Sequence, residues 1–476
     1  MSLVAAAFLR GLGVVYACAF LSLWVQVDAL YGPAGISPVG RWLVAAQEQL
    51  GAEAPLGFPS LFWLTGASEW ALHGLCALGL GAAVALIAGR LSLWAALTAW
   101  ASYLSFVSVG SVFLAFQWDL LLLEAGMVGL FAASAEPRLG VWLARALLLK
   151  LMFLSGAVKL ASGDSTWRDL TALTYHYWSQ PLPSPTSVAA AALPVPVQKL
   201  STFLTLAIEL GAPWGMLGPR RLRLASAALL AGLQGLIAAT GNYGFFNLLT
   251  LVLCACLLDD SDLARLRFLA RPEPVTRDRL RVPRRVAAGL VAASSLLVAC
   301  QRLTPPARFP GALRSFCDLL STLRSVNSYG LFAVMTTERP EIVIEGSADG
   351  ADWRPYQFRW KPGDLERAPR FAGPHMPRVD WQMWFAALGS CQDELWFQRF
   401  LQRVLEGSRP VTALFARNPF PGDPPRYLRT TLWQYRFAGG EERRAGACWV
   451  RSDPQSYCPI VTLRDGHLAA ANDLSR

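Results

Sequence analysis

The sequence predicts a polytopic α-helical membrane bundle of about nine spans, followed by a small β-rich α+β extracytoplasmic domain. The chain has 476 residues, of which 54% are hydrophobic and only 16% charged, whereas soluble domains average roughly 25% charged residues. Long apolar runs recur through the first part of the chain, which is typical of membrane spans. After about residue 304 the sequence becomes charged, proline-rich and strand-prone. We therefore expect residues 1–303 to form the transmembrane domain and residues 304–476 the outer domain.

Apolar segments account for the predicted spans. The first, about Gly11 to Val27, lacks the small-residue cleavage site of a signal peptide, so we expect it to be retained. Several segments are short or interrupted by glycine or by Pro213, which a bundle tolerates because neighbouring helices satisfy the freed backbone groups. The segments lie at residues 11–28, 68–89, 91–113, 118–134, 139–161, 199–218, 222–239, 243–258 and 286–303.

Arginine and lysine are distributed unevenly between the two sets of connections. With the N-terminus inside, the inward set holds fifteen of them, eight being arginines of the 259–285 loop, and the outward set holds five. Because cytoplasmic loops carry the excess of Lys and Arg, we expect a cytoplasmic N-terminus and an outer domain beyond the membrane. The membrane would be the bacterial cytoplasmic membrane, or that of the endoplasmic reticulum in a eukaryote. We interpret the net charge of +10 as this topology signal, because no nucleic-acid-binding motif is found.

The outer domain has strand and helix patterns of its own. "EIVIEGSADGADWRPYQFRW" predicts two strands around a Ser-Ala-Asp-Gly turn, and "PRYLRTTLWQYRF" alternates in the same way. "WQMWFAAL" and "LWFQRFLQRVLEG" have helical spacing, with Gly407 as a C-cap. Cys448 and Cys458 lie ten residues apart in a compartment that permits disulfides. Both a Cys448–Cys458 bond and two free thiols remain open.

Ionisable side chains fall inside the predicted spans, where they are costly and point to function. At 1.5 Å per residue, Asp119 and Lys159 fall near the outer face, Lys150 and Glu209 near the middle, and Glu124 between. One interpretation is a pair of internal ion pairs, in which Lys150 meets Glu209 or Glu124. The other is a polar cavity that opens outward, floored by Glu124 and rimmed by Asp119, Lys159 and the next outward loop.

That outward loop, "GDSTWRDLTALTYHYWSQPLPSP" (residues 163–185), is rich in aromatic and hydrogen-bonding groups. We expect an ordered lid in which Asp164 or Ser165 caps a short helix that begins near Trp167. Asp169 and His176 would then meet Lys159 or the Asn242 and Asn247 side chains, so that alanine at either position lowers function. His176 is interpreted either as a proton carrier or as a packed, hydrogen-bonded residue. The candidate binding residues are Gln117, Trp118, Asp119, Glu124, Trp167, Arg168, Asp169, Tyr175, Tyr177, Asn242, Tyr243 and Asn247.

Six motifs in order resemble the lipase maturation factor family: "FQWDLLLLEAGM", the 163–185 loop, "TGNYGFFNLLTLVLC", "NSYGLF", "VDWQMWFAALG" and "RNPFPGDPPRYLR". The resemblance runs from about Leu21 to about Phe437. It implies a multi-pass protein of the endoplasmic reticulum membrane that dimeric secreted lipases require to become active and exportable. The chain departs from the family at Trp178-Ser179, where an acidic residue followed by Thr is usual, and at Lys150, where arginine is usual. Its short length and its Ala and Arg content suggest a bacterial member.

A shorter stretch, "SGAVKLASGDSTW", resembles the membrane domain of vitamin K-dependent γ-glutamyl carboxylases and places that family's catalytic lysine at Lys159. Two hypotheses follow. In the favoured one, the chain is a maturation factor whose Trp167, Tyr175 and Trp178 contact a secreted client, possibly a lipase. In the other, it is a membrane enzyme with Lys159 as base and His176 in catalysis. Enzymatic activity stays open. Membrane lipids are the remaining expected partner, and no metal, cofactor or nucleic acid is expected.

Overall fold

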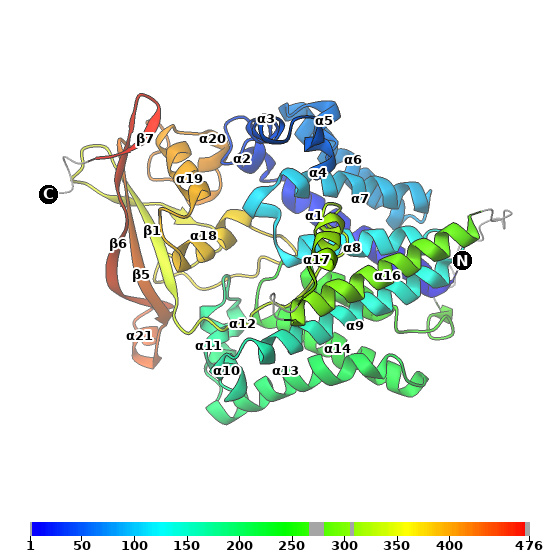
Figure 1. Cartoon of the computed structure of the whole chain (residues 1–476). Coiled ribbons are helices and arrows are strands. Elements are labelled where there is room, and N and C mark those ends of the chain that lie inside the picture. The colour runs from blue at the N-terminus through cyan, green and yellow to red at the C-terminus, as the bar shows by residue number, and fades with distance from the viewer. Residues whose placement is uncertain (1, 266–279, 305–308, 472–476) are drawn as a thin grey trace.

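The computed structural model of the chain describes residues 2–265, 280–304 and 309–471. A helical bundle forms one end of the molecule and an antiparallel sheet the other, with the N-terminus at the bundle end farthest from the sheet (Figure 1). The predicted helical bundle followed by a small β-rich domain is therefore confirmed. The long helices are α1 (Leu3–Trp24), α6 (Glu69–Ile87), α7 (Ser92–Val109), α8 (Gln117–Ala132), α9 (Pro137–Ala161), α13 (Val195–Gly215), α14 (Arg220–Thr240), α15 (Phe246–Ala255) and α16 (Arg281–Leu303).

Each predicted span contains one of these helices, but fewer are long enough to cross a membrane. Among the described residues, six are sufficiently long and apolar: α1, α6, α7, α9, α14 and α16. A seventh results if α12 (Pro185–Ala191) and α13, which meet at 114°, count as one broken span. α8 has 16 residues and α15 only 10, whereas a helix needs about 20 to cross the hydrocarbon core. Six or seven spans therefore replace the predicted nine, because an apolar run does not show where its helix ends.

Short helices lie in the connections, most of them on the side of the sheet (Figure 1). They are α2 (Val27–Tyr31), α3 (Val39–Leu50), α4 (Ala54–Gly57), α5 (Phe62–Thr65), α10 (Ser165–Arg168), α11 (Ala172–Ser179) and α17 (Gly311–Ser321), with 3₁₀ turns η1 (Gly51–Glu53) and η2 (Ser111–Leu114). Four of the eight arginines of the predicted inward loop 259–285 lie outside the described residues, within 266–279.

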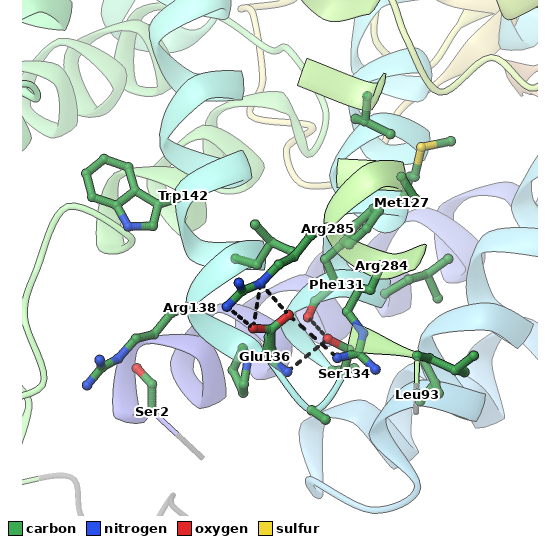
Figure 2. Close-up of a pocket in the computed structure, with 18 of the residues that line it drawn as sticks. Ser2, Leu93, Met127, Phe131, Ser134, Glu136, Arg138, Trp142, Arg284 and Arg285 are labelled. Atoms are coloured by element: carbon green, nitrogen blue, oxygen red, sulfur yellow. Dashed lines mark hydrogen bonds and ion pairs between the residues drawn. The ribbon is translucent and has the colours of Figure 1, made fainter. Parts of the chain in front are cut away.

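α16 lies at the edge of the bundle and contacts α9. Its first turn carries arginines that surround Glu136, the residue before α9. Arg285 donates to the Glu136 carboxylate at 2.7 Å, and the Arg284 side chain lies 3.9 Å from it (Figure 2). The Arg281 side chain lies 3.5 Å from the same carboxylate. Arginines therefore gather at the bundle end opposite the sheet.

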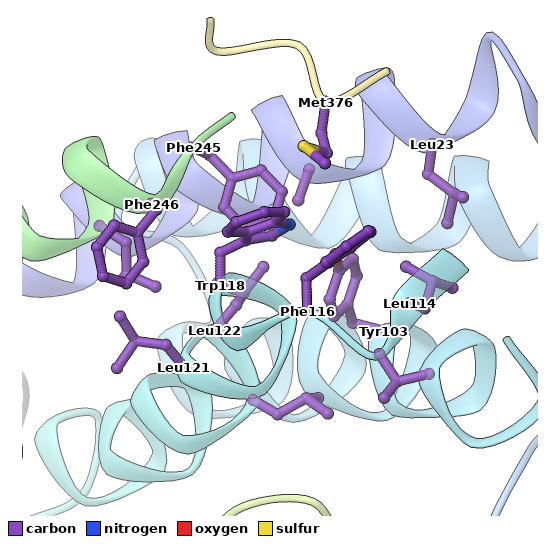
Figure 3. Close-up of a cluster of buried hydrophobic side chains, with 14 of the residues drawn as sticks. Leu23, Tyr103, Leu114, Phe116, Trp118, Leu121, Leu122, Phe245, Phe246 and Met376 are labelled. Carbon is purple, nitrogen blue, oxygen red and sulfur yellow. The ribbon is translucent and has the colours of Figure 1, made fainter. Parts of the chain in front are cut away.

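The bundle core is built from aromatic rings and close helix contacts. Figure 3 shows Phe116, Trp118 and Phe245 packed together, with Met376 of the outer domain above them. α1 approaches α6 closely because residue 79 is glycine: a Cβ atom there would lie 2.2 Å from the Phe20 ring. Because Met376 is fully buried, the outer domain contributes to the core of the bundle.

The outer domain contains a five-stranded antiparallel sheet of order β2-β1-β5-β6-β7. The predicted hairpin is present, with Gly350 at φ +84° in its turn. Ile342 and Ile344 of β1 are fully buried on the sheet face that packs against the helices. The elements are β1 (Pro340–Ser347), β2 (Arg354–Pro355), β3 (Gln357–Phe358), β4 (Phe415–Arg417), β5 (Tyr427–Phe437), β6 (Trp449–Arg464) and β7 (His467–Ala470), with helices α18 (Arg378–Leu388), α19 (Leu395–Leu405), α20 (Arg409–Thr412) and α21 (Gly440–Arg444).

The disulfide of the outer domain joins Cys391 to Cys458, and Cys448 is free. Both alternatives drawn from the sequence, a Cys448–Cys458 bond and two free thiols, are therefore wrong. Both cysteines belong to one extended segment, in which ten residues span about 33 Å at 3.3 Å per residue. The bond that forms instead ties the turn between α18 and α19 to the middle of β6.

Candidate functional site

The outer domain is fixed to the bundle by buried polar contacts, which we call the joint. At its centre, Asp119 in the first turn of α8 meets Arg378, the first residue of α18. Arg378 donates to both carboxylate oxygens of Asp119, at 2.5 and 2.8 Å, and the Tyr103 hydroxyl donates to the same carboxylate. All three side chains are fully buried. A bidentate, dry ion pair of this kind fixes orientation as well as distance.

A second contact of the joint surrounds Glu124, one turn deeper on α8. Lys150 of α9 pairs with Glu124, as one of the predicted alternatives has it, and also donates to Ser295 of α16 at 2.6 Å. The segment that enters the outer domain supplies the Tyr329 hydroxyl at 2.5 Å and the Asn327 backbone N–H at 3.1 Å. The Ser295 hydroxyl also donates to Glu124 at 3.2 Å, so the carboxylate has four donors, from α9, α16 and the outer segment.

Lys159 does not meet Asp119 at the rim of a cavity, as one interpretation expected. Its ammonium pairs with Glu209 of α13 at 2.6 and 2.7 Å, and both side chains are buried. The depth count put these two residues at different levels because it placed the whole of α13 in the membrane. The structure instead packs the first part of α13 against α11, where the Leu173 N–H donates to Thr202 at 3.4 Å.

The 163–185 loop is ordered and forms one wall of the joint. Asp164 caps α10 by accepting from the Thr166 N–H at 2.8 Å, as predicted. The helix then breaks at Leu170, which has φ +58°, and resumes as α11. The loop carbonyls bind the outer domain: fully buried Arg339 donates to the oxygens of Gln180 and Pro181 at 2.5 and 2.9 Å. The loop is therefore held by the outer domain along its exit.

Asn242 joins three segments of the chain at once. Its amide nitrogen donates to the Leu182 oxygen at 3.2 Å and the Arg370 oxygen at 2.9 Å, and its oxygen accepts from the Ala372 N–H at 2.7 Å. Because a side-chain amide offers donors and an acceptor together, this one residue connects the 163–185 loop, the bundle and the outer domain. Its neighbour Tyr243 bonds to both His176 and Gln180 at 2.8 Å.

The other predicted site residues divide between the joint and its surroundings. Gln117 accepts from the Gly330 N–H at 3.2 Å, and the buried Trp118 ring lies 4.8 Å from that of Trp381. Trp167 is only 2% exposed and lies under the Lys159 ammonium, so it does not present an aromatic surface to a client as we expected. Tyr177 is also buried, Tyr175 packs beside Trp178, and Asn247 bonds to Gln234 inside the bundle. Arg168 and Asp169 are exposed.

Sequence reasoning missed the residues on the outer side of the joint, chiefly Arg378, Arg339 and Tyr329. Tyr329 stands inside the quoted motif "NSYGLF", and Arg378 immediately precedes "VDWQMWFAALG". A buried carboxylate requires a cation, so Asp119 could have prompted a search for an arginine inside or beside the motifs of the outer domain.

In and beside the joint, buried carboxylates pair with buried cations, and this pairing limits the chemical reactions that these side chains could catalyse. Asp119, Glu124 and Glu209 each pair with a buried cation. Burial, reinforced by the charge of Lys159, lowers the pKa of His176 from 6.5 to about 4. His176 is therefore neutral near pH 7, and its Nε2 bond to Tyr243 fits the packed, hydrogen-bonded interpretation. The arrangement is suited to holding two domains in a fixed relation.

Asp169 is exposed, and Lys159 pairs with Glu209 instead, so the expected contact of Asp169 is wrong. We therefore expect His176→Ala to lower function while Asp169→Ala, contrary to the expectation from the sequence, leaves it unchanged. The first substitution removes the His176–Tyr243 bond at the wall of the joint, whereas the second removes an exposed side chain. Loss of one hydrogen bond with a buried partner costs about 1–3 kcal/mol. The test compares the function and the membrane abundance of both variants with those of the wild type. Equal loss in both would show that the exposed face of the loop, not the joint, carries its role.

The fold and the joint define a multi-pass membrane protein with a β-rich domain fixed to one end of its bundle. Two family models match, the "Lipase maturation factor transmembrane domain" over residues 3–265 and the "Lipase maturation factor C-terminal domain" over residues 325–459. The chain is 35% identical to Lipase maturation factor 2 of Homo sapiens, covering 96% of this chain and 82% of that protein. It is 32% identical to Lipase maturation factor 1 of Bos taurus, covering 96% and 88%. The chain belongs to the lipase maturation factor family. No solved structure matches it.

Proposed function

We propose that the chain is a membrane-embedded maturation factor that helps a secreted client, a lipase in the first instance, to reach its folded and assembled state. The family match along almost the whole chain carries this proposal. The joint supports it physically. A domain fixed to the bundle by Asp119–Arg378 and by Asn242 presents a constant surface at the membrane, which a client that emerges there meets in one orientation.

The outer domain offers such a surface where α18 ends and α19 begins. Phe385, Leu388 and Leu395 are 40%, 46% and 63% exposed there. The Cys391–Cys458 bond fixes the turn between the two helices. Exposed apolar side chains on a domain outside the membrane are typical of interaction sites. We propose that this surface, and not the buried Trp167, contacts the unfolded or partly folded client.

A photo-crosslinking amino acid at Leu388 or Leu395 tests the client role in cells that secrete a dimeric lipase. We expect the lipase to be captured from these positions before it is secreted. The matched control is Leu236, which is 67% exposed on α14, a helix long and apolar enough to cross a membrane. Capture of lipase at Leu236 alone, or no capture from either α18–α19 position while lipase still matures, would overturn the proposed surface.

The enzyme alternative receives no support from these observations. The relatives described above are lipase maturation factors, not carboxylases. Lys159, the base of that alternative, is buried in an ion pair with Glu209 and lies 5.1 Å from the Trp167 ring centroid. We therefore do not propose a carboxylase-like reaction.

We further propose that the outer domain lies outside the cytoplasm, on the secretory side of the membrane, and that the N-terminus is cytoplasmic. In a chain whose free cysteines are replaced and whose Cys391–Cys458 bond is kept, Gln392→Cys should react with a membrane-impermeant thiol reagent in intact cells or sealed vesicles of matching orientation. Arg221→Cys should react only after permeabilisation. Both positions are exposed; Gln392 lies in the turn between α18 and α19, and Arg221 in the first turn of α14. Identical labelling of the two would contradict this topology.

A further inference from the structure

A large hollow lies at the arginine-rich end of the bundle, far from the joint. It has a volume of about 1600 Å³ and is bounded by the end of α8, the start of α9 and the start of α16. Figure 2 shows Arg284 and Arg285 directed toward Glu136, while the Arg138 side chain points away from that carboxylate. Met127, Leu130 and Phe131 of α8 form an apolar wall beside these charges. Polar and apolar linings therefore meet in one hollow.

The charge balance of the hollow is positive. Among the described residues that line it, three are arginines, Arg138, Arg284 and Arg285, and two are carboxylates, Glu136 and Asp260. Asp260 is already engaged, because it accepts from the Ser2 hydroxyl and the Val4 N–H. Arg138 is exposed, and no carboxylate in the described part of the chain pairs with it. An anionic group is the natural complement to this side of the hollow.

The apolar side continues into the membrane. Trp142, one helical turn after Arg138 on α9, is 57% exposed, and tryptophan at such a position is typical of the boundary between headgroups and hydrocarbon. Trp142 and Val291 line both this hollow and a second one of about 390 Å³ between α9, α13 and α16. From Arg284 to Ser295, α16 rises about 16 Å, at 1.5 Å per residue. That length is close to half of the roughly 30 Å hydrocarbon core.

We propose that this pair of hollows binds one anionic phospholipid of the membrane leaflet at the arginine-rich side. Arg138 and the α16 arginines hold the phosphate and headgroup, Trp142 lies at the level of the glycerol, and the acyl chains run along α8, α9 and α16 toward Ser295. A phospholipid fits because it joins an anionic headgroup to hydrocarbon chains, and basic pockets between helices are known to bind such headgroups. The bound lipid covers part of α16, of whose most apolar 18-residue window only 17% is buried by protein.

The purified full-length chain in nanodiscs tests this proposal, with native mass spectrometry as the readout. The discs contain equal amounts of phosphatidylglycerol and phosphatidylcholine. When the protein is released from the disc, we expect it to retain phosphatidylglycerol in preference to phosphatidylcholine. Arg138→Gln should reduce that preference about fivefold. One arginine near a membrane surface contributes about 1 kcal/mol to the attraction of anionic lipid, which corresponds to this factor. Arg221→Gln is the matched control, because Arg221 is exposed at the same end of the bundle but does not line the hollow.

Two further experiments distinguish a specific lipid-binding site from nonspecific electrostatic attraction. Val291→Trp should lower lipid retention without any change of charge, because it fills the passage that both hollows share. Soluble glycerol phosphate should compete poorly, since it lacks hydrocarbon. Equal retention of the two lipids, equal effects of Arg138→Gln and Arg221→Gln, or full competition by glycerol phosphate would each overturn the proposal.

Discussion

Arg378→Leu is expected to lower the free energy of unfolding by about 3–5 kcal/mol, because it leaves the Asp119 carboxylate buried without a cation. Both partners are fully buried, and the guanidinium also donates to the Phe113 oxygen at 2.9 Å. Asp119 cannot turn to water, since Tyr103 and the first turn of α8 enclose it. Thermal unfolding of the purified protein in detergent, together with protease cleavage between bundle and outer domain, measures the effect.

The matched control is Arg354→Leu, at an arginine that is 60% exposed and paired with the exposed Asp352. Exposed pairs contribute about 0–1 kcal/mol, so this variant should unfold near the wild-type temperature. The double substitution Asp119→Leu with Arg378→Leu should recover part of the loss, because it leaves no stranded charge. If Arg378→Leu is no more harmful than Arg354→Leu, the ion pair does not hold the joint.

Loss of the joint should also abolish client maturation in the proposed function. The α18–α19 surface is carried on the same helix as Arg378, so an outer domain that detaches no longer presents Leu388 at a fixed place. Arg378→Leu should therefore reduce secreted lipase activity more than His176→Ala, which removes one hydrogen bond at the wall of the joint.

The sequence predicted features that depend on neighbours along the chain. The Asp164 cap and the β1–β2 hairpin follow from local rules for helix ends and turns, and both are present. Lys150 and Glu124 lie on adjacent apolar helices joined by a short turn, so their pairing was one of the two alternatives that helix geometry left open.

The rest of the site depends on contacts between distant parts of the chain. Asp119 and Arg378 are separated by 259 residues, and Cys391 and Cys458 by 67. Neither separation leaves a periodic signal, because each is set by how the outer domain folds back onto the bundle. The burial of Trp167 has the same origin, since its indole N–H donates to the Phe332 oxygen of the segment that enters the outer domain. The aromatic 163–185 loop, which we expected to contact a client, instead packs against other segments of the same chain.

Lys150→Ala is expected to be as destabilising as Arg378→Leu, and for a related reason. The substitution leaves Glu124 in the middle of the bundle with only neutral donors, chiefly Tyr329 and the Asn327 N–H, at a cost of about 3–5 kcal/mol. It also removes the bond to Ser295 that ties α16 to the bundle. Because α16 precedes the outer domain, its release should raise the overall protease sensitivity of the protein.

Two variants separate the charge of Lys150 from its volume. Lys150→Arg keeps the cation and should retain most of the stability, and Lys150→Met with Glu124→Gln should do so as well, because a neutral amide still accepts from Tyr329 without needing a cation. Lys150→Met alone keeps a long apolar side chain but strands the carboxylate, so it should resemble Lys150→Ala. The unfolding temperatures of these variants, measured in detergent, rank their stabilities. Should Lys150→Met match Lys150→Arg, packing rather than the ion pair would account for the role of Lys150, and the Glu124 contact of the joint would carry little of its stability.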